Sequence, residues 1–145
     1  MTIAQTATTS FKVELPQGIH NFGPTSPDTF KIALYTGAAT LDGSTAVYTT
    51  SGEVVGTGYT AGGNTAAQTS SSQTGGTYKL VLADPATWTA TGGTIGPFRY
   101  AVLYNDTTAS KNLIAWWDYG TSITLSAGDT FAVDFDPTTG VLTIA

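Results

Sequence analysis

The sequence contains no cysteine and little charge. Of its 145 residues, 5 are Lys or Arg and 10 are Asp or Glu, so that only 10% are charged, against about 25% in an average soluble domain. The absence of cysteine excludes disulfides and thiolate metal sites, and the sequence therefore does not indicate the redox compartment. The scarcity of charge leaves a surface of hydroxyl and backbone groups. Such a surface suits a protein that packs closely against neighbours.

The sequence also lacks clustered positive charge and long apolar runs. Its net charge is −5, and its basic residues stand singly at Lys12, Lys31, Lys79, Arg99 and Lys111. We therefore predict no nucleic-acid partner, because phosphate binding needs concentrated basic charge. No apolar run approaches the roughly 18 residues that span a membrane, and the N-terminus lacks a signal-peptide pattern. We expect a protein made in a cytoplasm, with no membrane partner.

What the sequence has is a series of short alternating apolar segments separated by turn residues. Phe30, Ile32 and Leu34 share one face of the clearest strand. In a later segment Phe131, Val133 and Phe135 alternate with Asp134 and Asp136. We expect both apolar sets to face one core and the two carboxylates to face away from it. About nine such strands predict an all-β, single-domain β-sandwich, with a jelly roll as the expected topology and an immunoglobulin-like sandwich as the alternative.

The ends of this pattern set the expected domain boundaries. Residues 1–10 are small and polar, which predicts a flexible N-terminal arm that a partner orders, and residues 11–145 form the sandwich domain. Phe11, Val13 and Leu15 alternate and predict a short strand. The one helical signal is Asp84 followed by Pro85, a capping residue and a first-turn proline that predict a single helical turn.

A glycine-rich stretch, "EVVGTGYTAGGN", is the first candidate site. It holds Gly56, Gly58, Gly62 and Gly63. A dinucleotide fingerprint requires G-x-G-x-x-G at the start of a helix, and here the last spacing is one residue too long and no helical pattern follows. Without a helix N-terminus there is no ready phosphate site. We therefore interpret these glycines as backbone devices for turns and bulges.

No motif of catalysis or metal binding stands out. His20 is the only histidine, there is no cysteine nucleophile, and no serine lies in a G-x-S-x-G elbow. Asp129, Asp134 and Asp136 are the candidate calcium ligands, but alternation explains the latter two as the polar face of a strand. We predict that the protein is not an enzyme and uses no cofactor and no metal.

The aromatic stretch "IAWWDYG" is the candidate interface. If the strand alternates, Ile114 and Trp116 face the core while Trp117 and Tyr119 share the outer face. Two exposed aromatic side chains suit either a protein interface or a sugar-stacking platform. We predict that Trp117 and Tyr119 form a protein interface.

The segment from Asp28 to Gly63, "DTFKIALYTGAATLDGSTAVYTTSGEVVGTGYTAGG", resembles a group of small virion proteins of tailed bacteriophages. The matching pattern is a "DTFKIALYT" strand, then "YTT" and "E-V-x-G-x-G-Y-x-A-G-G", and later an aromatic strand that ends in "DYG". The resemblance covers roughly two thirds of the chain and fades at both ends. The chain departs from the pattern at "FKVELPQG", where Pro16 interrupts the first segment.

The resemblance implies a head decoration, or cement, protein. Such proteins are small β-sandwich or jelly-roll domains that bind the outside of the major capsid lattice as dimers or trimers and join neighbouring capsomers. The expected partners are thus the major capsid protein and further copies of this chain, and the expected location is the outer capsid surface of the virion. The alternative is a tail or fibre-tip β-domain that binds host glycan through Trp117 and Tyr119.

Overall fold

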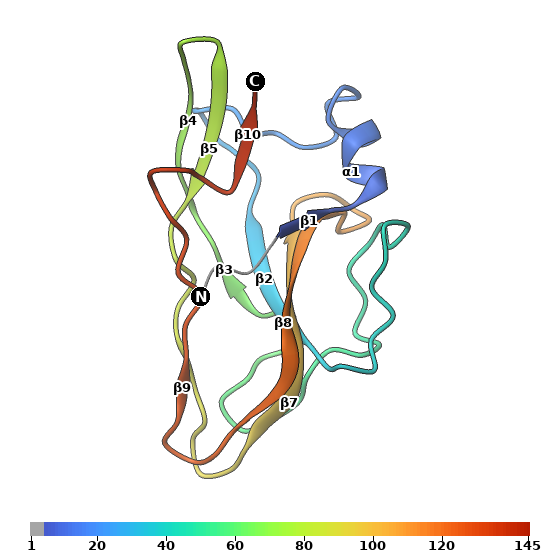
Figure 1. Cartoon of the computed structure of the whole chain (residues 1–145), viewed down its shortest axis with the longest axis vertical. Coiled ribbons are helices and arrows are strands. Elements are labelled where there is room, and N and C mark those ends of the chain that lie inside the picture. The colour runs from blue at the N-terminus through green and yellow to red at the C-terminus, as the bar shows by residue number, and fades with distance from the viewer. Residues whose placement is uncertain (1–4) are drawn as a thin grey trace.

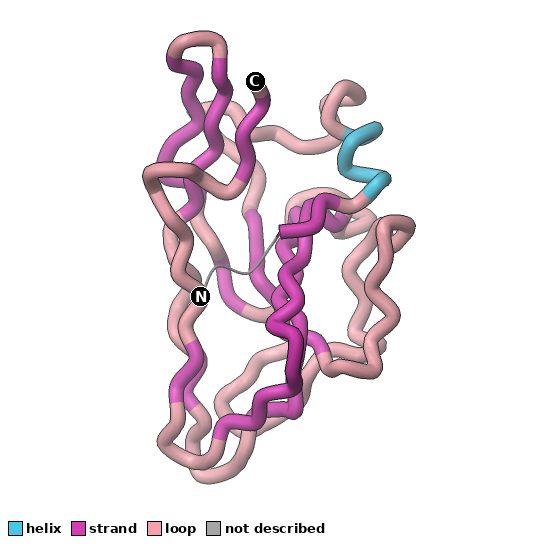
Figure 2. The backbone as a smooth tube through the Cα atoms, in the orientation of Figure 1, coloured by secondary structure: helices cyan, strands magenta, loops and turns pink. Residues whose placement is uncertain are grey.

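The computed structural model describes residues 5–145 and is an all-β sandwich with one short helix (Figures 1 and 2). The helix is α1 (Thr9–Glu14). The strands are β1 (Gln5–Ala7), β2 (Phe30–Tyr35), β3 (Asn64–Thr65), β4 (Gln68–Thr74), β5 (Thr77–Leu82), β6 (Trp88–Thr89), β7 (Ile95–Asn105), β8 (Leu113–Leu125), β9 (Thr130–Phe131) and β10 (Leu142–Ile144).

The strands form three antiparallel sheets. The largest has the order β1-β8-β7-β2-β3, the second the order β10-β5-β4, and β6 pairs with β9 in a short ribbon. The two longest strands, β7 and β8, form the hairpin that runs through the centre of the molecule in Figure 1. This arrangement confirms the predicted all-β sandwich. The jelly-roll topology stays a prediction.

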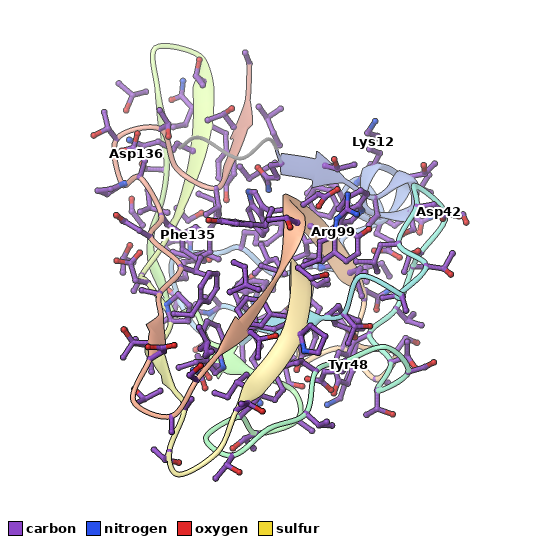
Figure 3. The ribbon with its side chains drawn as sticks, turned by 60° about the horizontal axis from the view of Figure 1, so that its bottom comes forward. Lys12, Asp42, Tyr48, Arg99, Phe135 and Asp136 are labelled. Atoms are coloured by element: carbon purple, nitrogen blue, oxygen red, sulfur yellow. The ribbon has the colours of Figure 1, made fainter. Side chains whose placement is uncertain are left out.

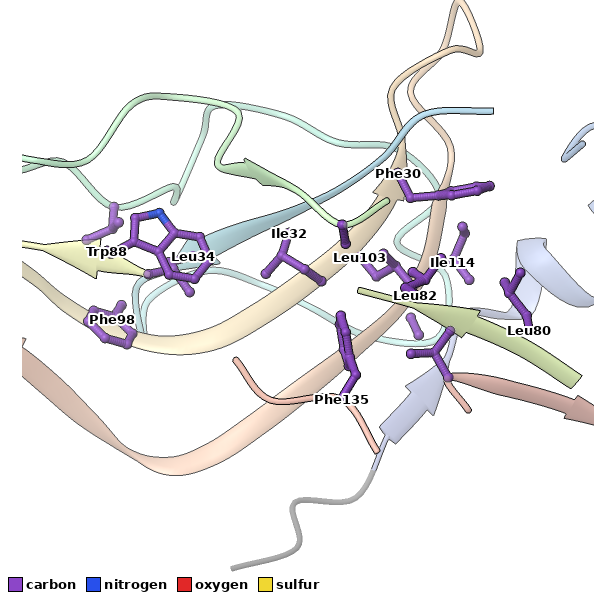
Figure 4. Packing of buried hydrophobic residues seen from close by; sticks show 14 of the residues in the cluster. Phe30, Ile32, Leu34, Leu80, Leu82, Trp88, Phe98, Leu103, Ile114 and Phe135 are labelled. Carbon is purple, nitrogen blue, oxygen red and sulfur yellow. The ribbon is translucent and has the colours of Figure 1, made fainter. Parts of the chain in front are cut away.

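The interior between the sheets is the main core. It is built around the β2 side chains Phe30, Ile32 and Leu34, none of which is exposed, and Figure 4 shows them beside residues of β5 and β7. Phe135 is buried in the same cluster, while Phe131 and Val133 pack against it half-buried. The prediction that the two apolar sets face one core is confirmed, and Asp134 is exposed as expected.

The large sheet is buried on its other face as well. There Ala33, Tyr35, Val102, Tyr104 and Leu113 form a second core. Its cover comes from the long connection between β2 and β3, residues 36–63, whose Tyr48 ring stacks on Tyr104 at 4.6 Å between ring centroids. The consequence is that neither face of β2 is left to solvent, as expected for a strand in which five of six residues are buried.

The structure corrects the expected strand at Phe11, Val13 and Leu15, which lie in and just after the helix α1. Thr8 caps this helix, because its Oγ1 accepts a hydrogen bond from the Phe11 amide at 3.2 Å. The same hydroxyl donates to the Leu113 carbonyl of β8. Phe11 is buried in the main core while Val13 is exposed. The cap at Thr8 and its contact with β8 therefore favour a helix over the strand that the three-residue alternation predicts.

The predicted arm is also corrected from Gln5 onward. Gln5–Ala7 forms β1 and pairs with β8, opposite residues 115–117, and Thr8 to Ser10 continue into α1. Residues 5–10 therefore belong to the folded domain. The remainder of the predicted arm, residues 1–4, lies outside the described residues.

The helical turn predicted at Asp84 and Pro85 is wrong. The segment from 83 to 87 has no regular secondary structure and leads into β6. Asp84 does use its carboxylate to accept a backbone hydrogen bond, but the donor is the amide of Phe135, 51 residues away, at 2.7 Å. A tertiary contact thus replaces the local cap that the sequence suggested.

Candidate functional site

A one-residue bulge in β8 decides which way its aromatic side chains point. Leu103 pairs with Ala115 and Tyr104 with Leu113, so Ile114 has no partner on β7. The bulge reverses the alternation: Ile114 lies in the main core while Trp116 packs on the second core. The prediction that Ile114 and Trp116 share a face is therefore wrong, because strict alternation does not survive a bulge.

The two predicted interface residues differ in exposure. Trp117 is half-buried and packs on the main core against Phe135, with ring centroids 5.8 Å apart. Phe135, labelled in Figure 3, belongs to the segment after β9. Tyr119 is 38% exposed. Together they line a cavity of only about 30 Å³. The expected outer face for Trp117 is thus corrected, and Tyr119 is the aromatic side chain that a partner can reach.

Tyr119 opens a second and larger bulge, which we call the β8 bulge (residues 119–122). Tyr100 pairs with Asp118 and Phe98 with Ile123, so four residues of β8 stand opposite Arg99 alone. All four are exposed. Gly120 has φ +90°, a conformation that favours glycine. The bulge therefore places Tyr119 on an exposed stretch of β8 that has no regular pairing with β7.

An ion pair fixes the base of the β8 bulge. Arg99 donates two hydrogen bonds to Asp118, Nε to Oδ1 at 2.7 Å and Nη2 to Oδ2 at 2.8 Å, and the guanidinium lies 5.3 Å from the centre of the Tyr100 ring. Asp118 Oδ1 also accepts from the Gly120 amide at 2.8 Å. The hydrogen bonds from Arg99 lower the pKa of the Asp118 carboxyl. A bidentate pair holds both partners in one plane, which gives the bulge a defined geometry.

Arg99 is the residue of this candidate site that the sequence does not single out. It is the only arginine in the chain, and its isolation in the sequence was interpreted as the absence of a basic patch. Its role depends on the register of β7 against β8, which composition does not reveal. The sequence holds no signal that selects Asp118 as its partner among the ten acidic residues.

The glycine-rich stretch is organised by the buried carboxylate of Glu53. Its Oε1 accepts from the Tyr59 hydroxyl and the Gly62 amide, both at 2.7 Å, and its Oε2 accepts from the Tyr48 hydroxyl at 2.6 Å. Burial and these contacts raise the pKa of both tyrosines. Tyr104 donates to the Gly62 carbonyl. The network ties the cover of the second core together.

The glycines of this stretch permit close backbone approach. A Cβ at Gly63, where φ is +68°, would lie 1.8 Å from the Ile32 carbonyl oxygen, and one at Gly58 would lie 2.0 Å from that of Thr89. Gly56 bridges to Ile95 of β7, where a Cβ would lie 2.3 Å from the Thr94 oxygen. The interpretation of these glycines as backbone devices is confirmed.

His20 lies in a closed polar cluster. Its side chain has no exposed surface; Nε2 is 3.0 Å from Glu14 Oε2, and Nδ1 is 3.1 Å from Asn105 Nδ2. Asn105 also donates to Asp28 and accepts from the Thr107 amide, which fixes its amide orientation. His20 Nδ1 must therefore accept, and Nε2 donates to Glu14. The two ring nitrogens thus connect Glu14 of α1 to Asn105 of β7, which is a structural role.

The three candidate calcium ligands do not converge on one site. Asp129 accepts from the Ser126 amide at 2.9 Å and Asp136 from the Thr138 amide at 2.7 Å, so each stabilises its own turn. Asp134 is exposed. Among residues 5–145, no three histidine or acidic side chains lie close enough together to hold a metal ion.

A groove of about 750 Å³ lies where the two larger sheets leave a gap. It is within the size range of small-ligand sites. Its lining includes Phe11 and Ile114 among hydroxyl-bearing residues of β4, β5 and the turn before β10. Lys79 is its one charged lining residue within the described chain, and the Lys79 ammonium donates to the carbonyls of Pro137 and Thr138. The groove is thus a nearly neutral surface that the sequence did not reveal.

No helix in the described part of the chain is long and apolar enough to cross a membrane. A comparison of the chain with family models, with curated proteins and with solved structures finds no match in any of the three.

Proposed function

We propose that the protein is a non-enzymatic cement protein that binds the outer surface of a phage capsid and stabilises the DNA-filled head. Three features support the proposal. The sequence resembles small virion proteins over the segment from Asp28 to Gly63, the fold is the β-sandwich expected of such proteins, and the low charge permits dense packing on a lattice without strong repulsion.

The observation that carries the proposal is the β8 bulge. It presents Tyr119 on an exposed, unpaired stretch of β8 that begins beside the Arg99–Asp118 pair. Little conformational entropy is lost when a rigid aromatic side chain enters a partner's surface, which is why tyrosine is common at interface hot spots. The first two residues of the bulge, Tyr119 and Gly120, belong to the "DYG" that the resemblance singles out. Tyr119 is therefore the residue we assign to the capsid contact, with the half-buried Trp117 beside it in the same small cavity.

The proposed mechanism is thermodynamic linkage. DNA in a filled head presses outward on the lattice. A protein that binds only the expanded lattice stabilises that state by mass action. Many copies on one lattice act together, because attachment at one point raises the effective concentration at the next. No catalytic group is needed for this function.

The first experiment is the copy number of the chain in purified virions that contain it. A cement protein approaches the copy number of the major capsid protein. A count of only a few copies per particle contradicts the proposal and favours the tail or fibre-tip alternative. A cryo-EM map of the same particles then locates the protein and identifies which surface faces the lattice.

The second experiment tests the β8 bulge itself. Tyr119→Ala should keep the fold and reduce occupancy on heads, with affinity falling about 30-fold for a loss of about 2 kcal/mol at a hot spot. The matched control is Val55→Ala, since Val55 is 79% exposed and lies in the cover of the second core. Full occupancy for Tyr119→Ala would exclude the bulge as the contact.

Glycan binding at a tail tip has less support from the geometry. A sugar platform needs an accessible aromatic face, and Trp117 is half-buried beneath Phe135. The cavity beside Tyr119, about 30 Å³, is far below the size of a small-ligand site. The alternative thus depends on Tyr119 alone.

A further inference from the structure

The strand β4 is the edge of its sheet, and it is regular except for a bulge between Gln68 and Ser70. It ends the order β10-β5-β4 and pairs only with β5, and Figure 1 shows it at the border of that sheet. Its seven residues, "QTSSSQT", make it the longest edge strand in the described chain, since β1 and β10 have three residues and β3 has two. Proteins normally block such edges with lysine, proline or a covering segment. Residues 70–74 of β4 carry neither charge nor proline.

The β4–β5 hairpin determines which backbone groups point outward. Gly75 and Gly76, at φ +60° and +89°, form a two-residue turn that closes on the Thr74–Thr77 pair. In an antiparallel ladder, hydrogen-bonded and non-hydrogen-bonded pairs alternate from the turn. Ser72 therefore directs its backbone groups at β5, while Ser71 and Gln73 direct theirs away from the sheet. These outward groups are free to form a second ladder.

The sequence of β4 is complementary to itself when it is reversed about Ser71. In an antiparallel pair of two such strands, Ser71 opposes Ser71, Ser70 opposes Ser72, and Thr69 opposes Gln73. Hydroxyl and amide side chains then meet each other, and these cross-strand pairs are favourable. No like charges meet, because the strand has none. In this register the outward backbone groups of Ser71 face those of Ser71 in the second copy as a hydrogen-bonded pair, and Gln73 faces Thr69, which lies at the bulge of β4.

We propose that two copies of this chain form a two-fold dimer through antiparallel pairing of β4 with β4 of the second copy, centred on Ser71. The result is a continuous six-stranded sheet. A two-fold axis closes the interface and uses up both free edges, so that the pairing ends at a dimer. The dimer is a property of the isolated protein and does not depend on the proposed capsid role.

The first test uses a single cysteine in a chain that has none. Ser71→Cys changes one atom and puts two thiols opposite each other on the axis, within the Cα separation that a disulfide spans. Under mild oxidation it should form a covalent dimer faster than Ser110→Cys by an order of magnitude or more. Ser110 lies on an exposed turn before β8 and is the matched control. Equal rates for the two variants would overturn the proposal.

The second test reads the register through charge. Thr69 and Gln73 are both exposed, and they oppose each other only in the Ser71-centred pairing. A Thr69→Lys, Gln73→Lys variant and a Thr69→Glu, Gln73→Glu variant should each have a mass near 14.9 kDa by light scattering, because like charges then meet twice. An equimolar mixture should restore twice that mass, as the unsubstituted chain has.

Each outcome decides the proposal. The proposal is overturned if the unsubstituted chain is a monomer or a trimer. It is also overturned if the mixture stays monomeric while both variants keep the wild-type circular dichroism spectrum. If the charged variants fail to fold, the Ser71→Cys comparison still decides. If the unsubstituted chain is a dimer but does not bind capsids, that result would count against the proposed function alone.

Discussion

The two motif-bearing regions of this protein are both built around a carboxylate, and they use it differently. In the cover of the second core, Glu53 is 8% exposed and accepts hydrogen bonds from two tyrosine hydroxyls and one amide. At the base of the β8 bulge, Asp118 is partly exposed and pairs with the only arginine. The buried carboxylate organises packing, whereas the exposed pair orients a turn that a partner can reach. The glycine-rich motif is thus architectural, whereas the aromatic motif carries the contact that we propose.

The largest effect that separates the regions is expected at Gly63. Gly63→Ala should abolish folding, because its Cβ would meet the Ile32 carbonyl and its φ disfavours any side chain. Gly120→Ala is the counterpart in the β8 bulge, where φ is also positive but no atom lies within 4 Å of the added Cβ. It should fold, with a loss of about 1 kcal/mol. Urea unfolding measures both, and comparable losses would contradict the division of roles.

Removal of the buried carboxylate is expected to have the next largest effect. Glu53→Ala leaves three donors without their acceptor in the interior and should lower the free energy of unfolding by about 3 kcal/mol or more. Glu53→Gln is the matched control. Its carbonyl oxygen can accept from Tyr59 and Gly62 while its amide donates to the Tyr48 oxygen, so its cost should be about 1 kcal/mol. Equal costs would mean that the negative charge, rather than the hydrogen bonds, holds the cover.

The exposed ion pair should contribute little, with a specific pH dependence. The hydrogen bonds from Arg99 lower the pKa of Asp118 from 3.8, and the Gly120 amide acts in the same direction. The stabilisation is therefore present above pH 3.8 and is lost as the pH falls through the lower folded-state pKa. Arg99→Gln should unfold at nearly the wild-type urea concentration at neutral pH, because exposed pairs contribute weakly. The difference between the two proteins should shrink further in acid, and a difference that grows there would refute the assignment.

The smallest expected effect is that of a chelator. Asp129 and Asp136 are a third kind of carboxylate, each stabilising its own turn with backbone amides as donors. The melting temperature should be the same in EDTA as in added calcium, when the two conditions are compared in separate thermal scans. A fall in melting temperature that calcium reverses would restore these residues as metal ligands.

The parts of the fold that could be predicted are those where local pattern and burial agree. Phe30, Ile32 and Leu34 lie where alternation placed them, because β2 is central and regular. The aromatic side chains of β8 were misplaced because a bulge at Ile114 is invisible to a period of two. The strand expected at Phe11 is a helix because its cap, Thr8, also bonds to Leu113, a residue distant in the sequence.

The candidate site could be predicted only in part for the same reason. The stretch "IAWWDYG" correctly predicted an exposed Tyr119, which is the aromatic side chain of the β8 bulge. The role of Arg99 and the groove between the sheets depend on registers and edges that form only in the folded chain. The second core escaped prediction because its cover, residues 36–63, has little regular secondary structure to recognise.

The turn between β4 and β5 makes this domain a natural carrier for foreign sequence. Gly75 and Gly76 are exposed, and an added Cβ at either would meet no atom within 4 Å. The hairpin end that they form projects at the top of Figure 1. Exposed turn tips of this kind accept insertions because no buried contact or backbone hydrogen bond is disturbed. An epitope or enzyme-recognition peptide grafted between these two glycines would be displayed away from the core, with the strands on either side still paired.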